Sequence, residues 1–258
     1  SLLAANTTTL KAAEATEALT AAMKQFNIAD KDAKSIIDSW LEVESRTAVT
    51  ARTMALALRQ TGTVARSAGV SFHELNGIIS AVGSATRESG NAIGTALKYI
   101  FSHMNTDDVI EKFSQLGIAV YDSDGKMRGL MDRLSSLNEK WKGMTSEQRT
   151  ATAIAIAGTR RYNSLMILMD KWGDVIDATK MSEDSYGRAM TANTRVMGTY
   201  AKQIEKTKAT MENFFATTFE SGGKGLLNYF ESLKQTIASI GAVMPDSLAT
   251  MIGSASVL

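Results

Sequence analysis

The chain has 258 residues, of which 44% are hydrophobic and 21% are charged, so its composition is that of a globular protein with a sizeable core. It contains no cysteine and only two histidines, His73 and His103, which excludes a disulfide framework, a thiol nucleophile and a cysteine-ligated metal. Lys and Arg total 28 against 27 Asp and Glu, and the net charge of +1 gives no bulk field that would attract nucleic acid or acidic membranes.

The near absence of proline indicates the fold class. One proline in the chain permits long helical runs, because proline breaks helices, and the 7% of aromatic residues argue against a β-sandwich or barrel. The sequence therefore predicts an all-α fold, a multi-helix bundle with one short β-hairpin at about 118–128 and a long C-terminal helix. It also predicts two domains, a helical core at 1–180 and a helical arm at 181–258. No window of about 19 residues is free of charge, so no membrane span is expected.

Apolar residues at helical spacing, with capping residues at their ends, predict the individual helices. One capping box runs from Ser71 to Glu74, a second joins Thr145 to Gln148, and Gly69 suits the left-handed position after a helix. Gly90 is expected to close the helix that Ser71 opens. The predicted helices cover about residues 10–26, 33–41, 49–68, 71–90, 92–104, 107–116, 129–141, 146–157, 160–179 and 182–219, with a last helix reaching 240 after a hinge at 221–225.

One segment, Gly117–Arg128, departs from the helical pattern. Apolar β-formers lead into Asp-Ser-Asp-Gly and a short second arm, and Gly125 can supply the positive φ of a tight turn. Asp122 and Asp124 alternate as in a calcium loop, but Lys126 stands where a third acidic ligand would be, so a turn is favoured over a metal site. The two predicted strands are Ile118–Tyr121 and Lys126–Arg128.

A basic stripe follows from arginines seven residues apart on one predicted helix, at positions 52, 59 and 66. Such a stripe can line a DNA-facing surface. The favoured interpretation is a solvated face whose charges pair with acids close in the sequence. The acids proposed as partners are Asp38, Glu42 and Glu44.

The order of several segments resembles a known family. The stretches 19–40 and 51–100 are similar to the core region of phage tail tape measure proteins, including the A-x-x-A-G-x-S element at 65–71. Ile93-Gly94-Thr95-Ala96-Leu97 matches the A-G-T-A-L element of the family except at its first residue. Residues 116–130 are similar to its short hairpin, and 157–169 to its closing helix, with Ala157-Gly158 where the family often has Phe-Gly.

The resemblance implies a structural role. Tape measure proteins occupy the lumen of the growing tail, fix its length, and leave before or with the DNA during ejection. The implied partners are other copies of the chain, the tail tube protein, tail assembly chaperones and tail tip proteins, without sequence-specific nucleic-acid binding. The implied location is the lumen of the virion tail, and the cytoplasm of the host bacterium during assembly. The alternative is a secreted helical effector or a pore-forming helical bundle.

Enzyme classes fit the residues poorly. Some tape measure proteins carry cell-wall hydrolase modules, but a cysteine-histidine amidase needs a cysteine and a zinc endopeptidase needs a histidine cluster. A transglycosylase would need one catalytic glutamate in a cleft, and each candidate stands where a helix cap or an exposed face explains it. Those candidates are Glu74, Glu88, Glu139 and Glu147. The sequence therefore predicts no enzymatic activity, no cofactor and no metal.

A heptad pattern runs along the long C-terminal helix. Met190, Met197, Ile204 and Met211 repeat every seven residues, and a second set follows each by three. That second set is Asn193, Tyr200, Thr207 and Phe214. The pattern predicts either a face packed against the helices before residue 179 or a seam that joins copies of the chain. The candidate self-association seam comprises Met190, Met197, Tyr200, Ile204, Met211 and Phe214, although the flanking e and g positions carry almost no charge.

Overall fold

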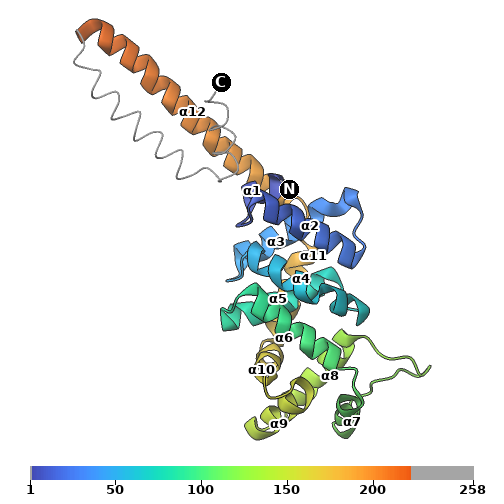
Figure 1. Cartoon of the computed structure of the whole chain (residues 1–258). Helices are drawn as coiled ribbons and strands as arrows, with labels where there is room; N and C mark the ends of the chain where they lie inside the picture. The colour runs from blue at the N-terminus through green and yellow to red at the C-terminus, as the bar shows by residue number, and fades with distance from the viewer. Residues whose placement is uncertain (1, 222–258) are drawn as a thin grey trace. The chain divides into compact units, whose positions relative to one another are not determined.

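The computed structural model describes residues 2–221, and this part of the chain is helical, with no strand (Figure 1). The all-α prediction is therefore confirmed over these residues. The predicted hinge at 221–225 and the last helix lie outside them, apart from Ser221. The helices are α1 Leu2–Thr7, α2 Ala12–Phe26, α3 Ala33–Arg46, α4 Ala51–Ser67, α5 Phe72–Thr86, α6 Gly90–His103, α7 Asp107–Gln115, α8 Leu130–Trp141, α9 Ser146–Ala157, α10 Tyr162–Asp170, α11 Trp172–Glu183 and α12 Arg188–Ser221, with a 3₁₀ turn at Asp30–Asp32.

The chain forms two compact units. One is Thr8–Arg188, which contains α2 to α11, and the other joins the described residues before Thr8 to the described residues from Ala189 to Ser221. The predicted domain boundary at residue 180 stays a prediction.

Helix α5 is the central element of the larger unit, and it contacts α3, α4, α6, α10 and α11. Its residues are buried on nearly every side, because apolar and small residues occupy almost all positions after the first turn. The predicted capping box opens the helix: the Ser71 Oγ accepts from the Glu74 N–H at 3.2 Å, and the Glu74 carboxylate accepts from the Ser71 N–H at 2.7 Å. The second predicted box, at Thr145 and Gln148, also forms.

Glycines let helices of this unit approach closely. A Cβ added to Gly94 of α6 would lie 2.5 Å from the Ala57 carbonyl oxygen on α4, and one added to Gly90 would lie 2.3 Å from the Thr53 carbonyl oxygen. Gly77 of α5 faces α11 in the same way. These contacts require residues without a side chain, so the small-residue elements of the sequence serve helix packing.

Two predicted helix boundaries are wrong. Gly90 opens α6 instead of closing α5, because Ser89 caps α6 by accepting from the Ala92 N–H, and Arg87 ends α5 in the left-handed conformation. The single helix predicted over 160–179 is two helices that meet at Lys171. The Asn138 side chain donates to the Met169 carbonyl oxygen at 2.6 Å, and it thereby occupies an oxygen that a continuous helix would use.

The predicted hairpin is reduced to a tight turn. Tyr121 and Met127 form one isolated antiparallel bridge, and neither predicted strand, Ile118–Tyr121 nor Lys126–Arg128, is present. Gly125 has φ +75°, as the sequence predicts, so the turn itself is confirmed. A two-arm ribbon without a third strand buries little apolar surface, which explains why pairing stops after one bridge. Figure 1 shows this loop extending away from the helices between α7 and α8.

Candidate functional site

Two buried carboxylates hold the turn before α12. Asp38 and Glu42 lie four residues apart on α3 and are 2% and 4% exposed. The Asp38 Oδ2 accepts from the Gly187 N–H at 3.0 Å, and Glu42 forms ion pairs with Arg46 and with Arg188, the first residue of α12. Gly187 has φ +81°, a conformation that favours glycine. We call Asp38, Glu42, Gly187 and Arg188 the polar anchor.

Hydroxyl groups extend the polar anchor toward α5 and α11. The Ser39 Oγ donates to the Ser182 carbonyl oxygen at 2.8 Å and lies 3.2 Å from the Ser185 Oγ. The Ser182 Oγ accepts from the Asn76 amide at 3.1 Å and lies 2.8 Å from the His73 Nδ1. Burial lowers the pKa of His73, opposed by the negative charge of Glu183.

The His73–Ser182 pair has the residue types of a hydrolase but not its accessibility. Ser182 is fully buried, at 0% exposure, so a substrate could not reach its hydroxyl oxygen. The pair therefore joins α5 to α11 as a structural contact. Sequence reasoning missed this cluster, although a signal existed: Asp38 and Glu42 stand among the buried apolar positions of α3, where unpaired acids are rare.

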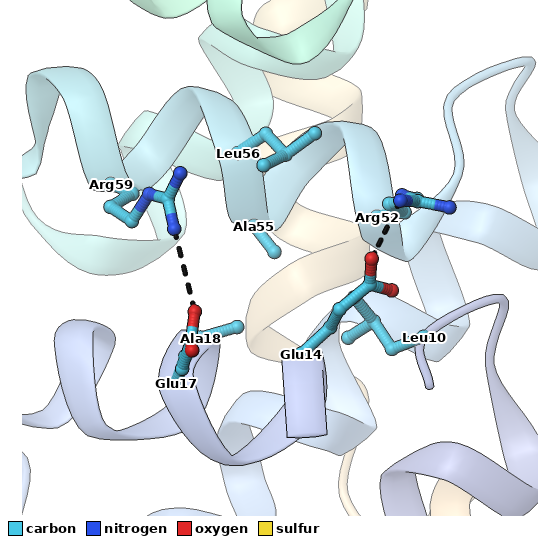
Figure 2. A pocket seen from close by; sticks show the side chains of 8 residues that line it. All are labelled: Leu10, Glu14, Glu17, Ala18, Arg52, Ala55, Leu56 and Arg59. Carbon is cyan, nitrogen blue, oxygen red and sulfur yellow. Dashed lines mark hydrogen bonds and ion pairs between the residues drawn. The ribbon is translucent and has the colours of Figure 1, made fainter. Parts of the chain in front are cut away.

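The arginine stripe on α4 pairs with α2, as Figure 2 shows for two of its three members. Arg52 lies 2.6 Å from Glu14, and Arg59 lies 3.6 Å from Glu17. Arg66 donates to the backbone oxygen of Gln25 at 3.0 Å. The prediction that these arginines are paired is therefore confirmed. The predicted partners are wrong, because α2, not α3, packs alongside this face of α4. Two of the three proposed acids are buried on α3. The proposed acids were Asp38, Glu42 and Glu44.

Between α2 and α4 lies a cleft of about 180 Å³. Leu10, Ala18, Ala55 and Leu56 line it, and the two ion pairs cross it (Figure 2). The space stays open because both helices carry small residues there. The four charged side chains across it form two ion pairs, so each positive charge has a negative partner. The cleft therefore offers no uncompensated charge for a ligand or for DNA.

The candidate seam on α12 is described as far as residue 209. Met190, Met197 and Ile204 are 51%, 48% and 66% exposed, whereas Tyr200 is buried at 8%. The helix is described to Ser221, but its side chains only to residue 209, so those of Met211 and Phe214 are not described. Three large apolar side chains at heptad spacing thus stand exposed on one face of the helix, as an association surface requires.

The turn at 122–127 uses its aspartate for backbone contacts. The Asp122 Oδ1 accepts from the N–H groups of Asp124 and Lys126, at 3.0 and 2.9 Å. Such an Asx-type turn accounts for Asp122 through backbone contacts. Over the described part of the chain, no group of three or more His, Asp or Glu residues could hold a metal ion.

The candidate catalytic glutamates stand in structural positions. Glu74 caps α5, and hydrogen bonds to its own backbone and to Thr145 lower the pKa of Glu147 at the start of α9. Glu88 and Glu139 are exposed.

No helix of the described residues has the length and the apolar character that crossing a membrane requires. The fold is that of a tightly packed helical module, and it includes a long helix whose apolar residues repeat every seven positions. Residues 1–158 match the phage-related minor tail protein family, and the chain belongs to this family of phage tail structural proteins. The chain is therefore a phage tail component, which favours the tail interpretation over the secreted-effector alternative.

A relative gives a more specific comparison. The chain is 24% identical over 204 residues to the tape measure protein of Pneumococcus phage Dp-1. These aligned residues make up 78% of this chain. It spans 18% of the length of that relative. No solved structure matches the chain.

Proposed function

We propose that this chain is a structural module of a tail tape measure protein, which sets tail length during assembly and takes part in DNA ejection. The observation that carries the proposal is the similarity to a protein of that name, in a chain that belongs to a minor tail protein family. The proposed location is the lumen of the virion tail, after assembly in the host cytoplasm. The proposed partners are further copies of the chain, the tail tube protein, tail assembly chaperones and tail tip proteins.

Helix α12 supports a role in measuring length. A ruler needs a length that its number of residues sets, and a helix supplies about 1.5 Å per residue. The 34 residues of α12 therefore span about 51 Å. Helices α2 to α11 pack against one another, so each of their residues contributes less length than a residue of α12.

The exposed seam supports association of copies through α12. Burying Met190, Met197 and Ile204 would remove apolar surface that a monomer leaves in water, at about 25 cal/mol for each Å². Asn193 and Thr207 at the d positions would lower the stability of such a bundle and restrict its register.

Light scattering and circular dichroism test this seam. The double variant Met197→Asp with Ile204→Asp should lower the molecular mass while helicity is kept. The matched control, Thr191→Asp with Thr199→Asp, adds the same charge to the other side of α12 and should keep the mass. A wild-type chain that is monomeric at high concentration, or equal effects of both variants, would contradict the seam.

An in-frame deletion of Thr8–Arg188 in the phage that encodes the protein tests the ruler, because electron microscopy measures tail length directly. Shorter tails support length determination. Tails of normal length that fail to deliver DNA would assign the module to ejection alone.

A further inference from the structure

The part of the larger unit where α6, α9 and α10 contact one another is basic (Figure 1). Residues 89–106 and 148–169, which include α6 and most of α9 and α10, contain four Lys and Arg residues and no Asp or Glu. One of the four, Arg149, pairs with Asp170 at 3.6 Å. The other three, Lys98, Arg160 and Arg161, form no ion pair within the described part of the chain. The net charge of +1 therefore conceals a local excess of positive charge.

An exposed aromatic ring lies in the same region. Tyr99 of α6 is 45% exposed, and its ring stacks on that of His103, with centroids 5.3 Å apart and an angle of 16° between the planes. The His103 Nδ1 donates to the Ile156 carbonyl oxygen of α9 at 2.7 Å, because a carbonyl oxygen can only accept. This hydrogen bond fixes the histidine ring and thereby the ring that stacks on it. Tyr99 is thus supported on one side and open to water on another.

The turn between α9 and α10 brings two of the three cations to this ring. A Cβ added to Gly158 would lie 3.3 Å from the Tyr99 Oη, so the turn begins against the tyrosine. The Arg161 N–H donates to the Gly158 carbonyl oxygen at 3.2 Å, and such a turn keeps the two Cα atoms within about 7 Å. Arg160 is exposed and Arg161 is half-buried, and Lys98, also exposed, precedes Tyr99 on α6. We call Tyr99 and these three cations the Tyr99 platform.

The residues of these helices favour one kind of anionic partner. A membrane-bound helix needs an apolar face that enters the bilayer, but Tyr99 is the one large exposed hydrophobic residue among the described residues of α6, α9 and α10. A DNA duplex offers phosphates to the cations, but its base faces are stacked on one another and would leave the tyrosine without a role. A single strand offers both phosphates and an open base face, as a basic surface with an exposed aromatic ring requires.

We propose that the Tyr99 platform binds single-stranded nucleic acid without sequence preference. Tyr99 stacks on an unpaired base, and Lys98, Arg160 and Arg161 contact the neighbouring phosphates. Three phosphate contacts on a single strand predict that log K falls with log[salt] at a slope of about −2.1. Raising salt fourfold therefore weakens binding by about eighteen-fold. The binding itself does not depend on the tail-length role of the chain.

Fluorescence anisotropy of the full chain with a short labelled oligothymidylate, starting at about 20 mM salt, tests the proposal. Tyr99→Ala should weaken binding at least about five-fold, because one base loses its stacking partner, whereas Tyr99→Phe should keep the affinity. Arg160→Gln should weaken binding and reduce the magnitude of the salt slope by about 0.7. Circular dichroism checks that each variant keeps its helicity and Tm.

Two matched controls separate the platform from general properties of the surface. Tyr121 is 47% exposed, as Tyr99 nearly is, but Asp122 follows it, so Tyr121→Ala should leave the affinity unchanged. Lys24 is an exposed cation of α2 that forms no ion pair in the described residues, so Lys24→Gln should leave the salt slope unchanged.

Four results would overturn the proposal. The first is no binding of the wild-type chain at the lowest salt. The second is an equal loss for a platform variant and its control, Tyr99→Ala with Tyr121→Ala or Arg160→Gln with Lys24→Gln. The third is binding of a DNA duplex as tight as that of the single strand and unaffected by Tyr99→Ala, which would mean that phosphates alone are bound. The fourth is tighter binding to phosphatidylglycerol vesicles than to the oligothymidylate, which would assign this surface to a membrane.

Discussion

Replacing Gly94 by alanine should destabilise the larger unit, although alanine is the better helix former. The added Cβ would lie 2.5 Å from the Ala57 carbonyl oxygen and 2.8 Å from the Ala57 Cα, about 1 Å closer than ordinary contact. Overpacking against a neighbouring backbone costs up to about 3 kcal/mol, and the gain in helix propensity returns about 1 kcal/mol. The net expectation is a loss of about 2 kcal/mol, or a fall in Tm of about 4–8 °C.

Urea unfolding followed by circular dichroism measures this loss, and an unchanged m-value would attribute it to the folded state. The matched control is Gly173→Ala, in the first turn of α11, where an added Cβ meets nothing within 4 Å. The control should leave stability unchanged or raise it by up to about 1 kcal/mol. A Gly94→Ala variant as stable as the wild type would refute the argument that glycine is needed for the α4–α6 contact.

The remaining predictions concern single groups. Because burial lowers the pKa of His73, the unfolded chain binds this proton more tightly, so the free energy of unfolding should fall as pH drops through 6.5. His73→Gln should lack this dependence, and equal pH curves would contradict it. Asp38→Asn should speed chymotrypsin cleavage after Tyr186, which is 97% exposed but flanked by anchored residues, and an unchanged rate would mean that the polar anchor does not hold the turn. Gly125→Val should cost at least about 1 kcal/mol, because a β-branched residue resists positive φ; an unchanged Tm would argue against it. EDTA should leave Tm unchanged, since Asp122 accepts from backbone N–H groups, and a clear fall would indicate a metal site.

Local signals in the sequence predicted most of the helices. The capping boxes at Ser71 and Thr145 involve residues three apart, so their hydrogen bonds are readable without tertiary information. Gly69 and Gly125 adopt positive φ where turn chemistry predicts it. Helix α1 escaped prediction because six residues are too few for a clear periodic pattern.

Features that depend on distant residues could not be predicted. The break between α10 and α11 depends on Asn138 of α8, and the partners of the α4 arginines depend on how α2 packs. The polar anchor joins Asp38 to Gly187 across most of the chain. In each case the local pattern allows several partners, and only the tertiary contacts select one. The heptad spacing on α12 predicts a seam, and association of copies through it stays a prediction.

The length of the tail in variants of α12 tests the central claim most directly. Deleting or duplicating 21 residues within α12 keeps the heptad register and changes the length of a continuous helix by about 32 Å. Electron microscopy of many virions should show mean tail lengths that decrease with the deletion and increase with the duplication. Tails of wild-type length in both variants would contradict a role of this chain in measuring the tail.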